Sequence, residues 1–194
     1  PDEPREIPFA SGAAVLLRAA ALREVGLLDP VLFLYQEDQD LGLRLRLAGW
    51  RARLAPRSLV WHHYGFSRNP EKYFWLERNR YLVLAKNLRL RSLLVLAVPL
   101  LLAEAAMLGL ALAGGWLPQK LRADAALLSP RLWRHVRAER ARVAALRRVG
   151  DAALARWFTP RLEFEGLAGG WLPRLLGAPM AAAWRLLRPL LAPR

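Results

Sequence analysis

Polar side chains gather at three places in the first half of the chain. An acidic run, EDQD, occupies residues 37–40, a histidine pair lies at 62–63, and Arg-Asn-Arg follows at 78–80. A carboxylate can take a proton from an attacking hydroxyl, imidazole with carboxylates can hold a divalent cation, and arginine suits phosphate groups. Each group also has a simpler explanation, because acidic residues cap helices, histidine pairs often lie packed or on a surface, and arginines often face solvent.

Short elements must position these groups. We interpret Ala13–Arg18 as a short buried strand and Ala19–Val25 as a short helix. Gly26 should end that helix, because glycine tolerates the left-handed backbone of a helix exit. Asp29-Pro30 then marks a turn in the loop that leads to the acidic run.

The segment Leu41–Trp50 fits two periodicities, since its leucines alternate as in a strand and also recur at helical spacing. We predict a helix, because the acidic run suits a helix N-terminus and Asp40 would pair with Arg44 one turn later. Beyond it, Arg51–Leu54 and Ser58–Trp61 have the composition of short strands. Tyr73–Asn87 is predicted to form a longer helix.

Composition limits the classes of function. The 194 residues include no cysteine, which excludes disulfide scaffolds, thiolate metal sites and cysteine nucleophiles. Net charge is +14, part of which reflects the arginine-rich, lysine-poor usage of a GC-rich genome. Residues 1–91 carry 15 basic and 10 acidic residues, whereas residues 92–194 carry 15 and 6. Because the excess lies in the more apolar half, we expect an anionic membrane surface as partner, and no nucleic acid.

Residues 93–113 are almost continuously apolar. As a helix they would extend about 31 Å, the thickness of a bilayer's hydrocarbon core. Pro99 and Glu104 near the middle argue against a span, so two alternatives stay open: crossing the bilayer, or a hairpin that is buried in protein or lies in the interface. Residues 131–148 form a basic amphipathic helix candidate, for which we favour membrane contact over the solvated face of a bundle.

The sequence LAGGWLP occurs at residues 112–118 and again at 167–173. A tryptophan at the end of an apolar stretch is typical of a membrane interface. Two similar turns in a chain of biased composition explain the repeat equally well.

The ordered series of motifs between Phe9 and Arg91 resembles the C-terminal half of a family-2 glycosyltransferase catalytic domain. The similarity is to bacterial rhamnosyltransferase-like and galactofuranosyltransferase-like members with the GT-A fold. It rests on a glycine-led strand, F-x-Y-x-E-D-x-D-L-x-x-R-x-x-x-A-G-W, H-x-x-G-x-S and an R-N-R helix, in that order. The resemblance implies an α/β fold for residues 1–91, as part of a GT-A domain with short strands plus helices. An apolar transmembrane or interfacial helix or hairpin over 92–118 and a basic amphipathic helical tail over 119–194 would follow.

The resemblance also implies roles for the acidic and histidine residues. Asp38 matches the catalytic base that takes a proton from the acceptor hydroxyl, and Glu37 would position the acceptor or share that work. His62, with His63 as second choice, matches the histidine that helps bind a divalent cation, Mg²⁺ or Mn²⁺, on the donor diphosphate.

Other residues receive binding or supporting roles. Gly12, Arg78 and Arg80 are predicted to meet substrate, the two arginines through a diphosphate or a lipid phosphate. Asp40 and Arg44 are predicted to be structural, holding the helix that presents the catalytic carboxylate.

The function implied is an inverting glycosyltransferase at the cytoplasmic face of the bacterial inner membrane. It would take a nucleotide-sugar donor and a polysaccharide or lipid-linked acceptor of the cell envelope. Nothing ahead of Phe9 matches the family's nucleotide-binding half and its Asp-x-Asp motif, so we expect this chain to be inactive alone. The alternative is a non-catalytic membrane-anchoring module derived from such an enzyme.

Overall fold

The structure, a computed structural model, describes residues 3–63, 69–160 and 171–191 of the chain. Strands β1 (Glu6–Ile7) and β2 (Ala52–Arg53) pair antiparallel, with Glu6 opposite Arg53 and Ile7 opposite Ala52. The helices are α1 (Ala19–Val25), α2 (Glu37–Leu47), α3 (Glu71–Asn87), α4 (Leu90–Val95), α5 (Ala97–Ala113), α6 (Leu117–Ala126), α7 (Pro130–Leu146), α8 (Asp151–Ala155) and α9 (Trp171–Leu187), followed by the 3-10 helix η2 (Arg188–Leu191).

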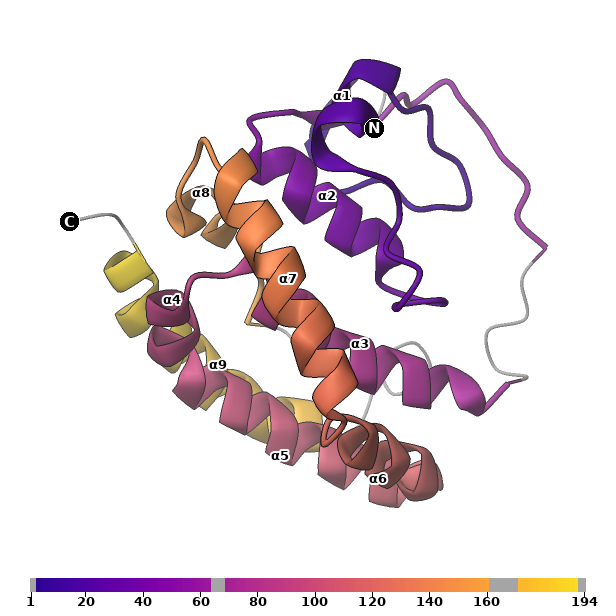
Figure 1. Cartoon of the computed structure of the whole chain (residues 1–194). Coiled ribbons are helices and arrows are strands. Elements are labelled where there is room, and N and C mark those ends of the chain that lie inside the picture. The colour runs from indigo at the N-terminus through magenta and orange to yellow at the C-terminus, as the bar shows by residue number, and fades with distance from the viewer. Residues whose placement is uncertain (1–2, 64–68, 161–170, 192–194) are drawn as a thin grey trace.

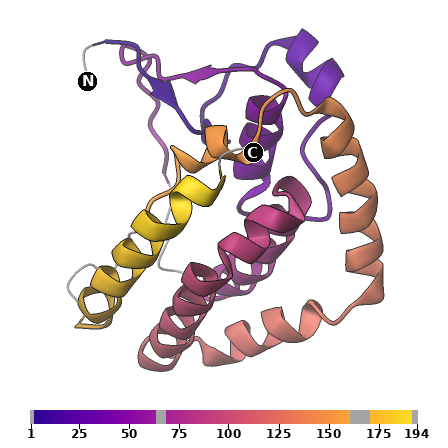
Figure 2. The ribbon, with the colours of Figure 1, turned by 90° about the vertical axis from the view of Figure 1, so that its left-hand side faces the viewer.

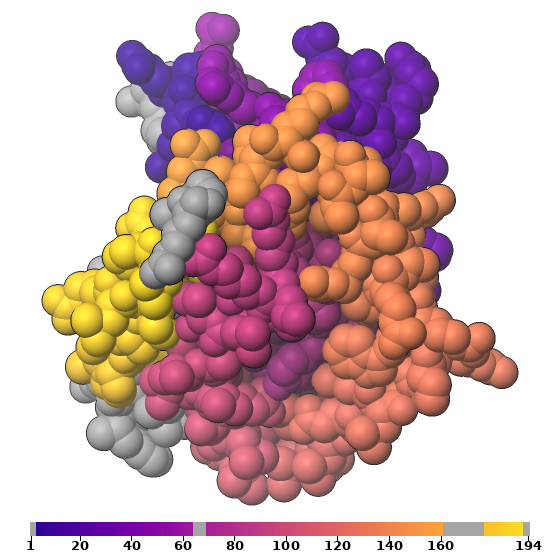
Figure 3. All heavy atoms as spheres, turned by 60° about the vertical axis from the view of Figure 1, so that its left-hand side comes forward, coloured from indigo at the N-terminus to yellow at the C-terminus, as the bar shows by residue number. Residues whose placement is uncertain are grey.

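Helix α3 is the element around which the others are arranged. It packs against α2, α6 and α7, and α7 crosses over α3 and contacts α2 beside it (Figure 1). Helices α5 and α9 lie side by side in an outer layer (Figure 2). In the space-filling view, the surfaces of α9, α5 and α7 adjoin on one face of the molecule (Figure 3).

The hydrophobic core joins both halves of the chain. One cluster of buried side chains draws Leu47 from α2, Leu96 from the α4–α5 junction, Val143 from α7 and Leu154 from α8. In a second cluster, Val136 of α7 joins buried residues of α3 and of the loop before α2. The valines on the apolar face of α7 are therefore buried against the protein, as in a helical bundle.

Several predicted elements are present. Helix α1 has the predicted bounds, and Gly26 follows it with φ of 84°. Helix α2 begins at Glu37, earlier than the predicted Leu41, so the acidic run forms its first turn. The predicted pair between Asp40 and Arg44 has an N–O distance of 2.9 Å.

Two predicted strands are wrong: neither Ala13–Arg18 nor Ser58–Trp61 is a strand. Leu16 is 99% exposed and Trp61 is 88% exposed, so these apolar runs are not buried. An apolar run forms a buried strand only where a neighbouring strand pairs with it, and the described residues provide none here. The chain as a whole is mostly helical, and in the predicted α/β part the described strands are the short pair β1 and β2.

The apolar stretch 93–113 is divided by a helix break at Leu96 into α4 and α5. Among the described residues, no helix combines the length and the apolar character that crossing a membrane requires. Glu104, the acidic residue within the stretch, forms an ion pair with Arg80 at 2.8 Å and another with Lys120 of α6, which is fully buried. Although burial opposes ionisation, hydrogen bonds from Lys120 and Tyr81 hold the pKa of Glu104 below its ordinary value.

Burial and a hydrogen bond to Glu104 raise the pKa of Tyr81 to about 12. The tyrosine therefore donates to this carboxylate throughout the neutral range.

The first copy of the LAGGWLP repeat forms an exposed turn between α5 and α6, with its tryptophan buried. Trp116 is 3% exposed and stacks on Tyr73 of α3 with ring centroids 4.4 Å apart, so it is not a membrane-interface side chain. In the second copy, residues 167–170 lie outside the described residues, and α9 begins at Trp171.

Residues 7–12 run antiparallel along α2 and bring the N-terminal segment to the acidic run. Arg46, near the end of the helix, donates to the carbonyl of Pro8 at 2.8 Å. One turn earlier, Gly42 faces Phe9 so closely that a Cβ on the glycine would lie 2.3 Å from the Cβ of Phe9. At the start of the helix, Asp38 accepts a hydrogen bond from the N–H of Gly12 at 3.0 Å. One contact per helical turn thus aligns this segment with α2.

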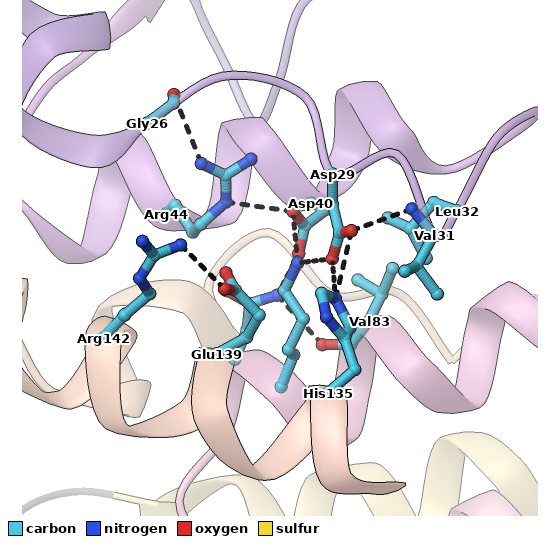
Figure 4. A network of polar contacts seen from close by, with 12 residues as sticks. Gly26, Asp29, Val31, Leu32, Asp40, Arg44, Val83, His135, Glu139 and Arg142 are labelled. Carbon is cyan, nitrogen blue, oxygen red and sulfur yellow. Dashed lines mark hydrogen bonds and ion pairs between the residues drawn. The ribbon is translucent and has the colours of Figure 1, made fainter. Parts of the chain in front are cut away.

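A buried polar network fixes the other side of α2 (Figure 4). Lys86 of α3 is 2.5 Å from Asp29 and 2.9 Å from Asp40, and Asn87 donates to Asp40 at 2.7 Å. Arg44 donates to Asp40 and also to the carbonyls of Val25, Gly26 and Leu27, which satisfies the end of α1. From α7, His135 lies 2.8 Å from Asp29.

Asp29 is ionised within this network. Although burial opposes its charge, hydrogen bonds with His135 and Lys86 keep the pKa of Asp29 below its ordinary value. A lowered folded-state pKa stabilises the fold above the unfolded-state value of about 3.9. That contribution is lost as the pH falls through the folded-state pKa of Asp29.

We predict that Asp40→Ala lowers the free energy of unfolding by about 3–5 kcal/mol, because it leaves Lys86 and Arg44 buried with too few counter-charges. Denaturant unfolding followed by circular dichroism measures the change. Glu71→Ala is the control: it removes an exposed pair with Arg122 and should cost less than about 1 kcal/mol. Equal losses in the two variants would contradict the structural role of Asp40.

Gly42→Ala tests the contact between α2 and residues 7–12. A glycine-to-alanine change inside a helix normally stabilises by about 0.5–1 kcal/mol. Here the new methyl would overlap Phe9, so we predict a loss of about 1–3 kcal/mol in the free energy of unfolding. Gly177→Ala in α9, where no described residue lies within 4 Å of the added Cβ, should stabilise instead. Stabilisation by both variants would show that residues 7–12 do not lie on α2.

Candidate active site

The loop before α2 has an unusual backbone. Phe33, Tyr35 and Gln36 have φ angles of 58°, 63° and 66°, a left-handed conformation that non-glycine residues rarely adopt. Backbone strain of this kind persists only where surrounding contacts hold it. Gln36 is the residue immediately before α2, so the loop sets the position and direction of the helix N-terminus.

Helix α3 supplies the contacts that hold the loop. The side-chain amide of Asn79, which is fully buried, donates to three loop carbonyls at 2.8–2.9 Å. Arg78 donates to a fourth carbonyl, and Gln36 donates back to the carbonyl of Leu76 at 3.0 Å. The four loop carbonyls belong to Val31, Leu32, Leu34 and Tyr35. These bonds satisfy backbone groups that the left-handed turns leave without partners in the loop itself.

Asp38 lies half-buried in the first turn of α2. One of its oxygens accepts the N–H of Gly12 at 3.0 Å, and the other accepts the N–H of Gln39 at 2.7 Å. Backbone N–H groups and a helix N-terminus both favour a carboxylate. With one backbone donor on each oxygen, the carboxylate retains lone pairs that can accept a further proton donor.

Glu37 has a different environment. Its Oε2 atom is buried and has no hydrogen-bond partner among the residues that the structure describes. Burial raises the pKa of Glu37, and the negative charge of Asp38 raises it further. Adjacent carboxyls whose environments differ are able to divide proton acceptance and proton donation between them.

The predicted metal ligands lie on a segment without regular structure. His62 and His63 are exposed beyond β2, and the H-x-x-G-x-S motif continues into residues 64–68, outside the described part of the chain. Within the described ranges, no three acidic or histidine side chains gather to hold a metal ion. The roles of His62 and His63 stay predictions.

The two predicted phosphate-binding arginines make contacts within the protein. Arg78 is buried, donates to the loop, and stacks over Trp75 with its guanidinium carbon 4.5 Å from the ring centroid. Arg80 forms ion pairs with Glu77 at 2.9 Å and Glu104 at 2.8 Å. Their contact with substrate is untested, and the structure gives Arg78 a supporting contact under the loop.

Sequence reasoning missed the positioning residues of α3. Asn79, Lys86 and Asn87 are buried polar side chains on a helix whose apolar residues, such as Leu82 and Val83, are buried as well. Spacings of seven and eight residues place all three on one helix face. That polar stripe within an apolar helix was the signal that could have identified them.

Comparison with known proteins gives matches to the N-terminal part of the chain. Residues 3–82 match the model of a family described as "Glycosyltransferase like family 2". An N-acetylglucosaminyl-diphospho-decaprenol L-rhamnosyltransferase, from two strains of Mycobacterium tuberculosis, is 41% identical over 75 residues. Those residues are 37% of this chain and 24% of the relative, so the chain spans about a quarter of the curated relatives it matches. No solved structure matches the chain.

The family match covers β1, α1, α2, β2 and most of α3, and therefore the loop, its α3 contacts and both candidate carboxyls. Residues 3–82 are thus a segment similar to family-2 glycosyltransferases, with Glu37 and Asp38 inside it.

Proposed function

We propose that this chain is the acceptor-side part of an inverting glycosyltransferase. It would act with a nucleotide-sugar donor on a lipid-linked or polysaccharide acceptor of the cell envelope. The observation that carries the proposal is the half-buried carboxylate of Asp38, held by backbone N–H groups at the start of α2, within the segment that matches the family. The name of the mycobacterial relative, which specifies a sugar on diphospho-decaprenol, supports a lipid-linked acceptor.

In the proposed reaction, Asp38 accepts the proton of an acceptor hydroxyl while the hydroxyl oxygen attacks the anomeric carbon of the donor sugar. The bond from that carbon to the diphosphate oxygen breaks on the opposite face, so the nucleoside diphosphate leaves and the configuration inverts. General-base catalysis of this type contributes about 10²–10⁴ in rate. The contact with Gly12 fixes the carboxylate against α2 during the reaction.

Glu37 is proposed to position the acceptor. Because its pKa is raised, a larger share of Glu37 carries a proton at mildly acidic pH than for an ordinary glutamate. A protonated carboxyl can donate a hydrogen bond to an acceptor oxygen, whereas Asp38 accepts one.

We include a divalent cation, Mg²⁺ or Mn²⁺, in the proposal only because the family resemblance implies one. The described residues do not assemble a ligand set for it, and His62 and His63 would supply imidazole nitrogens to a cation that prefers oxygen.

The proposed location is the cytoplasmic face of the bacterial inner membrane. Helices α4 and α5 carry exposed apolar side chains at helical spacing, and the exposed Arg89 and Arg91 lie at one end of the row. An apolar helix face with flanking cations is typical of proteins that bind an anionic bilayer surface. The same row supports the second candidate, a membrane-anchoring module without activity. The row of exposed apolar side chains consists of Leu90, Leu94, Val98, Leu101, Leu108 and Leu112.

A fusion protein tests the catalytic proposal. The part of the mycobacterial relative that precedes the matched segment is joined to the N-terminus of this chain, and sugar transfer to a lipid diphosphate acceptor is measured. We predict that the fusion is active and that Asp38→Asn lowers its rate by about 10²–10⁴-fold, because the amide cannot accept the proton.

Glu71→Gln is the matched control, since Glu71 is an exposed carboxylate at the start of α3, and it should leave the rate unchanged. A folded fusion without transfer favours the anchoring module. Full activity of the Asp38→Asn fusion removes Asp38 from the mechanism.

A further inference from the structure

A cavity of about 410 Å³ is lined in part by Gln36 and Gln39, the residues on either side of the candidate carboxyls in the sequence. Its walls come from α2, α3, the α4–α5 region, residues 157–160 and α9, and it therefore joins the family-like segment to the helices that follow. Its volume falls in the range of small-molecule binding sites. Leu84, Leu96, Leu100, Trp157 and Trp184 are among the side chains that make the lining mainly apolar.

The wall formed by α2 is polar near the candidate carboxyls. Gln36, Gln39, Leu43 and Arg46 line the cavity, and their spacing places them on one face of the helix. Gln39 directly follows Asp38 and donates its backbone N–H to that carboxylate. One lining residue of the cavity is therefore bonded directly to the proposed base through its backbone.

Arg80 places a guanidinium at the same end. It lines the cavity from α3, one turn beyond Leu76, whose carbonyl accepts the side-chain amide of Gln36. Two carboxylates pair with its terminal nitrogen, but its Nε is buried and has no hydrogen-bond partner in the described part of the chain. A guanidinium in the cavity wall suits the oxygens of a phosphate group.

We propose that this cavity binds the hydrocarbon chain of a lipid-linked acceptor, with the diphosphate at the Gln39–Arg80 end. This inference rests on the proposed function and assigns the acceptor's substrate class to that site. An apolar lining fits an isoprenoid chain, while the amides and the guanidinium fit a diphosphate. With the diphosphate beside Gln39, the sugar that it carries lies toward Asp38. The helices after residue 82, which the family match does not cover, then supply most of the apolar wall.

Binding of geranylgeranyl diphosphate to the 194-residue chain, followed by tryptophan fluorescence, tests the proposal. Ala103 lines the cavity, so Ala103→Trp should fill it and weaken binding by about tenfold or more. Ala105 lies two residues further along α5 and is exposed, so Ala105→Trp is the matched control and should bind as the unmodified chain does. Equal affinity of the two variants, or no binding by the unmodified chain, would overturn the proposal.

A second variant tests the orientation. Gln39→Glu places a negative charge beside the predicted diphosphate and should weaken binding of geranylgeranyl diphosphate about tenfold while leaving geranylgeraniol unaffected. Equal effects on both ligands would place the diphosphate elsewhere and overturn the assignment. Binding of dioctanoyl phosphatidylglycerol with the same affinity and the same loss in Ala103→Trp would assign the cavity to membrane lipid instead.

These binding measurements require no sugar transfer, so they separate the two proposals. An active, Asp38-dependent fusion whose cavity binds no isoprenoid would refute the inference alone. Isoprenoid binding by a chain whose fusion is inactive would refute the proposed function.

Discussion

The loop from Asp29 to Gln36 is held against the buried polar face of α3, and the candidate site depends on that contact. Lys86 binds the start of the loop through Asp29, and Asn79 binds its carbonyls up to Tyr35. Within this loop the backbone is left-handed at three non-glycine residues, a conformation that a free loop would not keep. Because α2 begins directly after the loop, the same hydrogen bonds determine where Asp38 meets Gly12.

The helices after residue 82 take part in this arrangement. His135 of α7 reaches Asp29, Lys120 of α6 pairs with Glu77 and Glu104, and valines of α7 complete the core beside α2 and α3. The amino-acid composition changes near residues 91 and 118, but helices on both sides of these positions pack against one another. The acidic residue in the apolar stretch has a structural explanation, since Glu104 provides the negative charge that a fully buried lysine requires.

The sequence predicted local features well where a local cause decides them. Gly26 ends α1, the acidic run begins α2, and Asp40 pairs with Arg44, each within a few residues of its partner. Strands at Ala13–Arg18 and Ser58–Trp61 could not be predicted correctly, because a strand depends on a pairing partner that an apolar pattern does not reveal. The function of Asn79 was missed for a similar reason, since its partners lie more than forty residues away in the chain.

Hydrogen exchange of residues 31–39 in Asn79→Ala tests the central claim most directly. The variant removes the donor from three loop carbonyls, so we predict faster exchange across the loop and at the amide of Gln39, which binds Asp38. Asn69→Ala, at the exposed N-terminal end of the same helix, should leave that exchange unchanged. Unchanged exchange over residues 31–39 in Asn79→Ala would contradict the claim that α3 holds the loop and positions the carboxylate.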